Sequence, residues 1–173
     1  GVAERMLVPL FIERDFKELN SRYVSFLDIG GSHAHRLKPL VEKLRIPTVI
    51  ITDVDPCEEQ DGKPKKNGEP TKKLVAVANT GQAGLHCGNP TLRGWHPKLQ
   101  KLDDFKNPTD AQLVWSETAE CLVRFAWQLP VAEADGSWPS SFEDSLVLTN
   151  MLWFKGLMEE RLDDDGMEIE QPT

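Results

Sequence analysis

Asp53 and Asp55 are the residues of this sequence best suited to chemistry, because they follow a short apolar run directly. The run Thr48–Ile51 comes after Pro47 and is β-branched throughout, which predicts a strand buried on both faces. Alternation along an extended chain places the two carboxylates on one side and Val54 on the other. Carboxylates are preferred ligands of hard cations such as Mg²⁺, and open α/β sheets gather ligands at the carboxyl ends of their strands. The pair therefore indicates a cation site; the alternative is two acids that end a strand and begin a turn.

The elements before this run alternate between helix and strand. Apolar spacing predicts a helix over residues 2–19, a strand over 22–29, and a helix over 33–44 with Ser32 as its N-cap. Together with the strand at 48–51, this order predicts an α/β fold. Its strands are expected to be parallel and joined by right-handed crossovers.

The second half of the chain has weaker signals. Residues 56–73 mix proline and glycine with Glu and Lys, which predicts a solvated loop. We expect a strand within 74–78, a helix starting within 110–117, and a strand over 121–129. Ser141 is expected to cap a long helix that continues to about Arg161. The division that follows is one domain over residues 1–161 and an acidic tail over 162–173.

The bulk composition limits the class of protein. The chain has 173 residues, a net charge of −8 and three widely spaced cysteines. An odd, scattered set of cysteines argues against a disulfide framework and favours the cytoplasm. A zinc site built from Cys57, His86 and Cys87 would match no familiar ligand spacing. Because the chain is acidic, any grip on nucleic acid must be local or come from another domain.

Three motifs occur in a recognisable order: Gly1–Glu4 leading into a helix, Asp53–Asp55 ending a strand, and Ser141–Asp144 opening a late helix. Asp28–Ser32 lies between the first two. This arrangement resembles a TOPRIM domain, the catalytic module shared by topoisomerases, bacterial primases and several nucleases. It is most similar to the C-terminal nuclease domain of the OLD (overcoming lysogenization defect) family. The Asn79-Thr80 turn and the segment 95–97 add to the likeness, which covers most of residues 1–160.

The resemblance implies a Rossmann-like, mostly parallel sheet flanked by helices, with a loop-rich insertion and a late C-terminal helix. The family pattern is a strand, then Glu-Gly-x-x-Glu, then a helix. This chain begins at the glycine of that pattern, so Glu4 corresponds to the second glutamate. The first glutamate and the first strand are therefore expected upstream of Gly1.

The resemblance also implies a DNA endonuclease that hydrolyses phosphodiester bonds with two Mg²⁺ or Mn²⁺ ions. An ATPase domain is expected ahead of the nuclease domain. Cations at such a site lower the pKa of an attacking water and stabilise charge on the leaving oxygen. The expected metal ligands are Glu4, Asp53, Asp55 and Glu143, with Asp28 and Asp144 as further ligands or as partners that orient them.

A basic group must offset the charge that develops on the phosphate. Lys155 is the candidate for this catalytic role, since it lies about three helical turns beyond Glu143. A lysine on a helix face is more often simply solvated. Alternative cations for gripping the nucleic-acid backbone are Arg36, Arg93 and Lys98, and either His33 or His35 could act as a general base or lie unused on the surface.

Each acid also has an ordinary structural explanation. Glu4 could be a first-turn acid that suits the helix dipole, Glu143 a capping acid beside Ser141, and Asp28 a turn residue before Gly30. Two other functions stay open: a catalytically inactive TOPRIM module that serves interaction or regulation, and a primase. A topoisomerase is disfavoured, because the sole tyrosine, Tyr23, is predicted to begin an inner strand.

Overall fold

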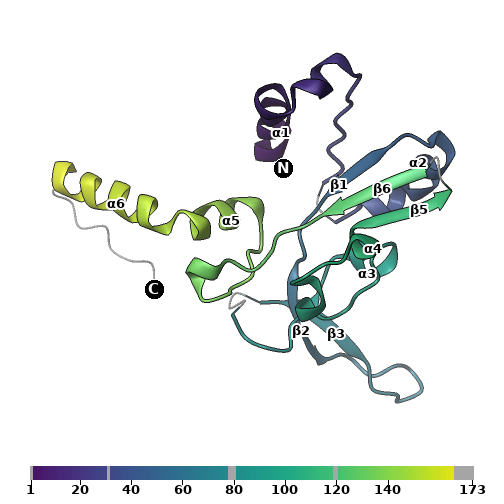
Figure 1. Ribbon diagram of the computed structural model, residues 1–173. Coiled ribbons are helices and arrows are strands. Elements are labelled where there is room, and N and C mark those ends of the chain that lie inside the picture. Colours follow the sequence, from purple (N-terminus) through teal and green to yellow (C-terminus); the bar gives the residue numbers. More distant parts are fainter. Residues whose placement is uncertain (1, 31, 78–80, 119–120, 166–173) are drawn as a thin grey trace.

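Helices and strands are both present throughout the computed structural model, which describes residues 2–30, 32–77, 81–118 and 121–165 (Figure 1). The mixed α/β class predicted from the sequence is confirmed. The helices are α1 (Val2–Asp15), α2 (Lys38–Leu44), α3 (Pro90–Gly94), α4 (Asp110–Leu113), α5 (Phe142–Thr149) and α6 (Met151–Asp165). The strands are β1 (Thr48–Ile51), β2 (Pro56–Asp61), β3 (Lys72–Ala76), β4 (His86–Cys87), β5 (Val114–Thr118) and β6 (Cys121–Ala126).

The first sheet has the strand order β1-β6-β5. β1 runs parallel to β6, with Ile50 opposite Phe125, and β5 pairs with β6 in the antiparallel sense. Ile50 and Phe125 are buried, together with Val123 on the same face of β6. Because β1 and β6 are parallel, the residues that follow both strands meet at one edge of the sheet.

The prediction that β1 is buried on both faces is wrong. Val49 is 64% exposed and Ile51 is 58% exposed, whereas Ile50 between them is buried. Within the described residues β6 is the one strand that pairs with β1. A strand with one covered face shows this alternation even when all its residues are apolar, because the pleat points every second side chain outward.

The strand predicted over residues 22–29 does not form. This segment is irregular, and Tyr23 is 96% exposed. Aromatic and β-branched residues favour strands only where a neighbouring strand supplies hydrogen bonds and cross-strand contacts. The parallel partner of β1 is instead β6, which lies far along the chain.

The predicted loop over residues 56–73 is largely a hairpin. β2 pairs with both β3 and β4 in a second, antiparallel sheet. Lys72 Nζ lies 2.8 Å from Asp61 Oδ1 and 3.8 Å from Glu59 Oε1 across the hairpin. The sequence did not predict strand β2 because its outward-facing residues, Glu59 and Asp61, are charged, and charged residues are also typical of loops.

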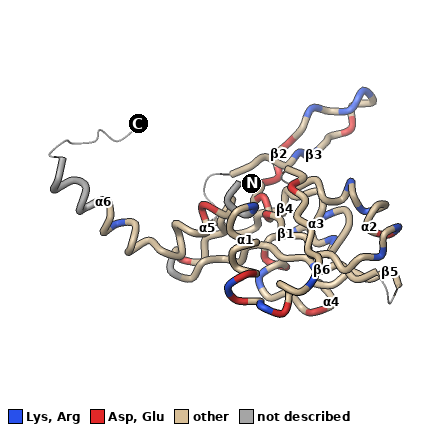
Figure 2. Tube along the Cα trace, turned by 90° about the horizontal axis from the view of Figure 1, so that it is seen from above, with Lys and Arg blue, Asp and Glu red and all other residues tan. Residues whose placement is uncertain are grey.

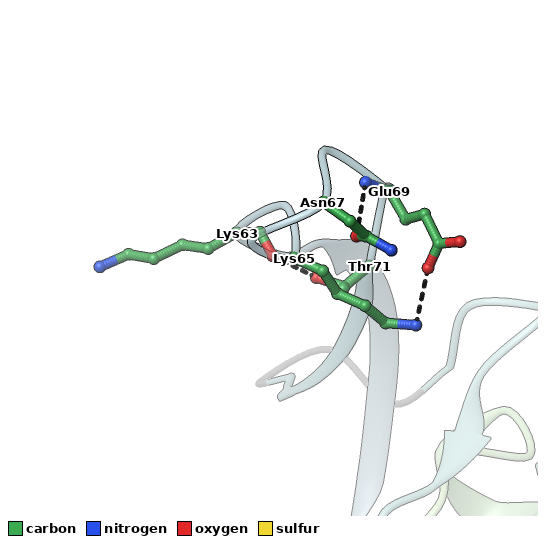
Figure 3. Close-up of polar contacts among 5 residues, drawn as sticks. All are labelled: Lys63, Lys65, Asn67, Glu69 and Thr71. Carbon is green, nitrogen blue, oxygen red and sulfur yellow. Dashed lines mark hydrogen bonds and ion pairs between the residues drawn. The ribbon is translucent and has the colours of Figure 1, made fainter.

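The tip of this hairpin has its own polar contacts (Figure 3). Thr71 Oγ1 donates to Lys63 O at 2.6 Å, and Lys65 Nζ contacts Glu69 Oε2 at 3.0 Å. Asn67 Oδ1 accepts from the backbone N–H of Glu69. Residues 56–76 contain five lysines and four acids, and Figure 2 shows both signs along the hairpin. The hairpin is therefore not a purely basic arm of the kind that binds phosphates by charge alone.

Several helix boundaries differ from those predicted. α1 ends at Asp15 and a separate 3-10 helix, Lys17–Ser21, follows it. Ser32 does not cap the next helix, which begins with the 3-10 turn Ala34–Leu37. The helix expected within 110–117 is limited to α4, because the chain turns into β5 at Val114.

The late helix is capped as predicted but is interrupted. Ser141 Oγ accepts from the backbone N–H of Asp144 at 3.1 Å, which satisfies a free helix N–H. Asn150 separates α5 from α6, and its side chain donates to Leu146 O at 2.8 Å. Figure 1 shows α6 extending away from the two sheets. The predicted turn at Asn79-Thr80 and residues 166–173 of the acidic tail lie outside the described residues.

The core forms between the first sheet and the segments around α3. Trp95 makes edge-on contacts with Trp115 and Phe125 at ring-centroid distances of 5.5 and 5.3 Å. Leu92 and Phe105 are fully buried in the same cluster. In the part of the chain that the structure describes, no helix is long and apolar enough to cross a membrane.

Candidate metal site at the end of strand β1

Five segments that are distant in sequence meet around one hollow of about 400 Å³. Its lining includes Asp53 after β1, Gln128 after β6, Asp28 in the segment before Gly30, Arg5 of α1 and Phe142 of α5. The sheet edge where parallel strands end therefore forms one wall. The sequence motifs that contain the predicted ligands border the same space.

Asp53 and Asp55 form the centre of the site. Val54 between them is fully buried, and both aspartates are half-buried. Asp53 lines the hollow, whereas Asp55 is not among its lining residues. Burial raises the pKa of the Asp55 carboxyl, and the nearby Asp53 charge raises it further. The two carboxylates are thus close enough to repel one another, the situation that a bound cation relieves.

Two features fix this acidic pair. Gln128 Nε2 donates a hydrogen bond to Asp53 Oδ1, which orients that carboxylate from the neighbouring strand. Asp55 has a φ of 51°, a left-handed conformation that is unusual outside glycine. Such conformations cost free energy and persist only where surrounding contacts enforce them.

Asp28 and Glu143 lie near the hollow, but both side chains are exposed. Asp28 lines the hollow, but its side chain is exposed and its Oδ1 accepts from the N–H of Gly30 at 3.1 Å, as a turn residue does. Glu143 is exposed in the first turn of α5, next to the lining residue Phe142. Asp144 lies in the first turn of the same helix, where its Oδ2 accepts from the N–H of Ser140 at 2.8 Å. Glu4 belongs to α1, but its side chain lies outside the described part.

Lys155 does not line the hollow. It is exposed on α6, in a different helix from Glu143. Its predicted role assumed one continuous helix, and the break at Asn150 removes that register. Among the described residues that line the hollow, Arg5 of α1 is the one Lys or Arg. The one feature of the sequence that could have pointed to Arg5 is its position directly after Glu4, a predicted metal ligand.

The two histidines near Gly30 are also outside the hollow's lining. His35 Nδ1 lies 3.3 Å from Ser32 O and 3.2 Å from Thr91 Oγ1, so it has local partners. His33 is exposed. Neither is brought to Asp53.

The donor set fits a hard divalent cation only in part. Asp53 and Asp55 supply carboxylate oxygens, the donors that Mg²⁺ and Mn²⁺ prefer. The buried Oε1 of Gln128, beside Asp53, has no hydrogen-bond partner. Among the described residues, however, no three Asp, Glu, His or Cys side chains are gathered into a group that could hold a metal ion. Asp53 and Asp55 on their own supply fewer ligands than a divalent cation takes.

A zinc site is not supported. Cys57, Cys87 and Cys121 are buried free thiols, as expected without a disulfide framework. Burial raises the pKa of Cys87 to about 12. Among the described residues, Cys57, His86 and Cys87 do not form a group that could hold a metal ion.

Comparison with known proteins finds two similarities. Residues 1–55 match the family model described as "Overcoming lysogenization defect protein-like, TOPRIM domain". The resemblance to OLD-like TOPRIM domains is confirmed. The matched segment runs from the start of the chain through Asp55 and so ends on the acidic pair. The chain is also similar to Endonuclease GajA of Bacillus cereus (strain HuB5-5), with 29% identity over 150 residues.

That alignment covers 87% of this chain and 19% of the relative, so the chain spans about a fifth of the length of GajA. No solved structure matches the chain. The likeness to a TOPRIM domain therefore rests on sequence and on the α/β arrangement around the acidic pair.

Proposed function

We propose that this chain is the nuclease part of a larger ATPase-nuclease, and that it hydrolyses DNA phosphodiester bonds with divalent cations. The OLD-like TOPRIM match and the similarity to an endonuclease support a nuclease-type role. The divalent cations, the DNA substrate and the ATPase domain go beyond these two similarities and belong to the proposal. The ATPase domain would lie in sequence beyond this chain, as the much greater length of GajA allows.

The observation that carries the proposal is the acidic pair at the end of β1. Asp53 borders a hollow of about 400 Å³, and Asp55 lies close enough to sense its charge. Nearby like charges that are partly buried raise the free energy of the empty site. Such an arrangement favours Mg²⁺ or Mn²⁺, which bind oxygen ligands and neutralise both acids.

The residues of the chain have separable roles in this proposal. Two bound cations would supply the Lewis acidity that activates a water and stabilises the leaving oxygen. Asp53 and Asp55 hold the cations, and Gln128 keeps the Asp53 carboxylate oriented. Glu4, Asp28 and Glu143 are proposed to complete the ligand set. Arg5, which borders the hollow, is better placed than Lys155 to contact a phosphate.

The test is a plasmid-nicking assay with the intact protein in Mg²⁺, Mn²⁺ or EDTA. Asp53→Asn and Asp55→Asn, which keep side-chain size and remove one charge each, are expected to lower cleavage at least about 100-fold, in line with loss of a group that acts directly on charge development. Arg5→Ala and Lys155→Ala, assayed in parallel, decide which of these two basic side chains contributes to cleavage. Cleavage that persists in EDTA, or that survives both aspartate substitutions, refutes the proposal.

A second function is favoured by one observation, which is that the described residues assemble no complete metal-ligand group. The chain would then be an inactive TOPRIM module that serves interaction or regulation. In that case the wild-type protein would bind no Mn²⁺ and cut no plasmid under any condition. Manganese binding measured beside the nicking assay therefore separates the two functions.

A further inference from the structure

Asn89 holds the chain at the point where β1 ends and the acidic pair begins. Its Nδ2 donates to Thr52 Oγ1 at 2.8 Å and to Asp53 O at 2.5 Å. Its Oδ1 accepts from the N–H groups of Thr91 and Leu92 at 2.9 and 3.2 Å, which caps α3. One fully buried amide therefore links the N-terminus of a helix to the backbone of a proposed metal ligand.

Gly88, which precedes Asn89, contacts the backbone of Asp55. The N–H of Gly88 lies 2.7 Å from Asp55 O and 3.2 Å from Val54 O. Asp55, whose carbonyl accepts this hydrogen bond, is the residue with the left-handed backbone conformation. Gly88 and Asn89 thus hold the backbone of residues 53–55 from one side, while Gln128 holds the Asp53 carboxylate from another.

Thr91 extends the same connection to the Gly30 loop. Its Oγ1 donates to Ser32 O at 2.7 Å and accepts from the N–H of His35 at 3.0 Å. Thr91 is fully buried, and the contacts of its side-chain hydroxyl are to the segment that follows Asp28. The start of α3 therefore joins two of the segments that border the hollow.

We infer that Asn89 is a positioning residue for the Asp53–Asp55 carboxylates, through its hydrogen bonds to Thr52 and Asp53. The inference rests on the proposed metal site. Asp53 and Asp55 lie in the connection between β1 and β2, outside the residues assigned to either strand. An amide that is buried, fully bonded and joined to a helix N-terminus is a rigid support, whereas an exposed side chain would not be.

The choice of variants separates positioning from stability. Asn89→Ser keeps a good helix N-cap but is too short to reach Asp53 O in the same way. Asn89→Ala removes both the cap and the link, and serves as the harsher second variant. Thr109→Ala is the matched control, because Thr109 lies at the start of α4 and its hydrogen bonds go to Gln112 rather than to the acidic pair.

Three measurements on the intact protein carry the test: Mn²⁺ affinity by electron paramagnetic resonance, hydrogen exchange of the backbone amides of residues 53–55, and melting temperature. Asn89→Ser is expected to weaken Mn²⁺ binding by about 10-fold or more, as is usual when a group that orients a ligand is lost. Exchange at residues 53–55 is expected to accelerate. Thr109→Ala is expected to lower the melting temperature without changing either of the other measurements.

An Asn89→Ser protein with wild-type Mn²⁺ affinity and wild-type exchange, and a lower melting temperature alone, overturns the inference and leaves Asn89 a structural cap. A wild-type protein that binds no Mn²⁺ refutes the proposed metal site instead. Hydrogen exchange then decides the remaining question by itself. Faster exchange confined to residues 53–55 supports the role of Asn89 in fixing this segment, and unchanged exchange overturns it.

Discussion

Replacing Gly88 with alanine tests the close approach between the acidic pair and the segment that joins β4 to α3. A Cβ atom at this position would lie 2.6 Å from Cys57 Sγ, 2.7 Å from Asp55 O and 3.2 Å from Asp55 Cβ. The backbone oxygen of Asp55 cannot rotate away as a flexible side chain could. Gly88→Ala must therefore displace the chain that carries Asp55.

The size of the effect follows from these distances. The contact with Asp55 O is about 0.7 Å shorter than the 3.4 Å at which ordinary contacts begin. Overpacking of this kind typically costs about 1–3 kcal/mol, which corresponds to about 2–4 °C of melting temperature per kcal/mol in a chain of this size. A displacement near 1 Å at a catalytic group can lower activity about 100-fold, so cleavage is expected to fall at least about 10-fold.

The assay compares Gly88→Ala with Gly94→Ala, since both add one methyl group near α3. A Cβ at Gly94 meets nothing within 4 Å, so that variant is expected to match or slightly exceed wild-type stability. Adding Cys57→Ala to Gly88→Ala removes the contact with Sγ but not the contact with Asp55 O. The double variant is therefore expected to regain part of the stability and little of the cleavage or Mn²⁺ affinity. Equal stability and cleavage for Gly88→Ala and Gly94→Ala would refute the reasoning.

Two further predictions concern titratable groups. Burial lowers the pKa of His96 from its ordinary value of 6.5. Below pH 6.5 the imidazole takes up a proton more readily in the unfolded chain than in the folded chain. The wild-type protein should therefore lose stability relative to His96→Gln as pH falls. Urea unfolding curves of both proteins at pH 7.5 and 5.5 measure this, and an equal loss in the two proteins would contradict it. The pKa of Asp55 is raised above 3.8 by burial and by Asp53, so its charge opposes folding once pH exceeds that value. Asp55→Asn should therefore melt higher than the wild type at neutral pH without metal and equally at pH 3, and a lower melting temperature at neutral pH would contradict the repulsion.

Local sequence signals predicted the elements that border the site. The β-branched run Thr48–Ile51 formed β1, and Ser141 capped α5 through a single hydrogen bond. The strand predicted over 121–129 formed β6, in which the alternating residues Val123 and Phe125 are buried. These features depend on residues within one turn or one strand of each other, and such short-range preferences can be seen without knowledge of the fold.

The failures have a common physical origin in long-range pairing. Residues 22–29 have strand composition but obtain no strand partner, whereas the charged segment Pro56–Asp61 obtains two, in β3 and β4. Pairing between distant segments decides whether a chain of given propensity becomes a strand. The same limit applies to Lys155, whose predicted position depended on an unbroken helix through Asn150.

The acidic pair shows most clearly what the sequence could not reveal. Asp53 and Asp55 were recognisable from their spacing, but the groups that fix them are Gln128, Gly88 and Asn89. Asn89 is followed by Pro90, and Asn followed by Pro is a common start for a helix. Its cap role was therefore visible, and its bond to Asp53 O was not. Because two like charges that are held this firmly cannot separate to reduce their repulsion, a divalent cation is the partner that would lower the free energy of the site without moving the chain.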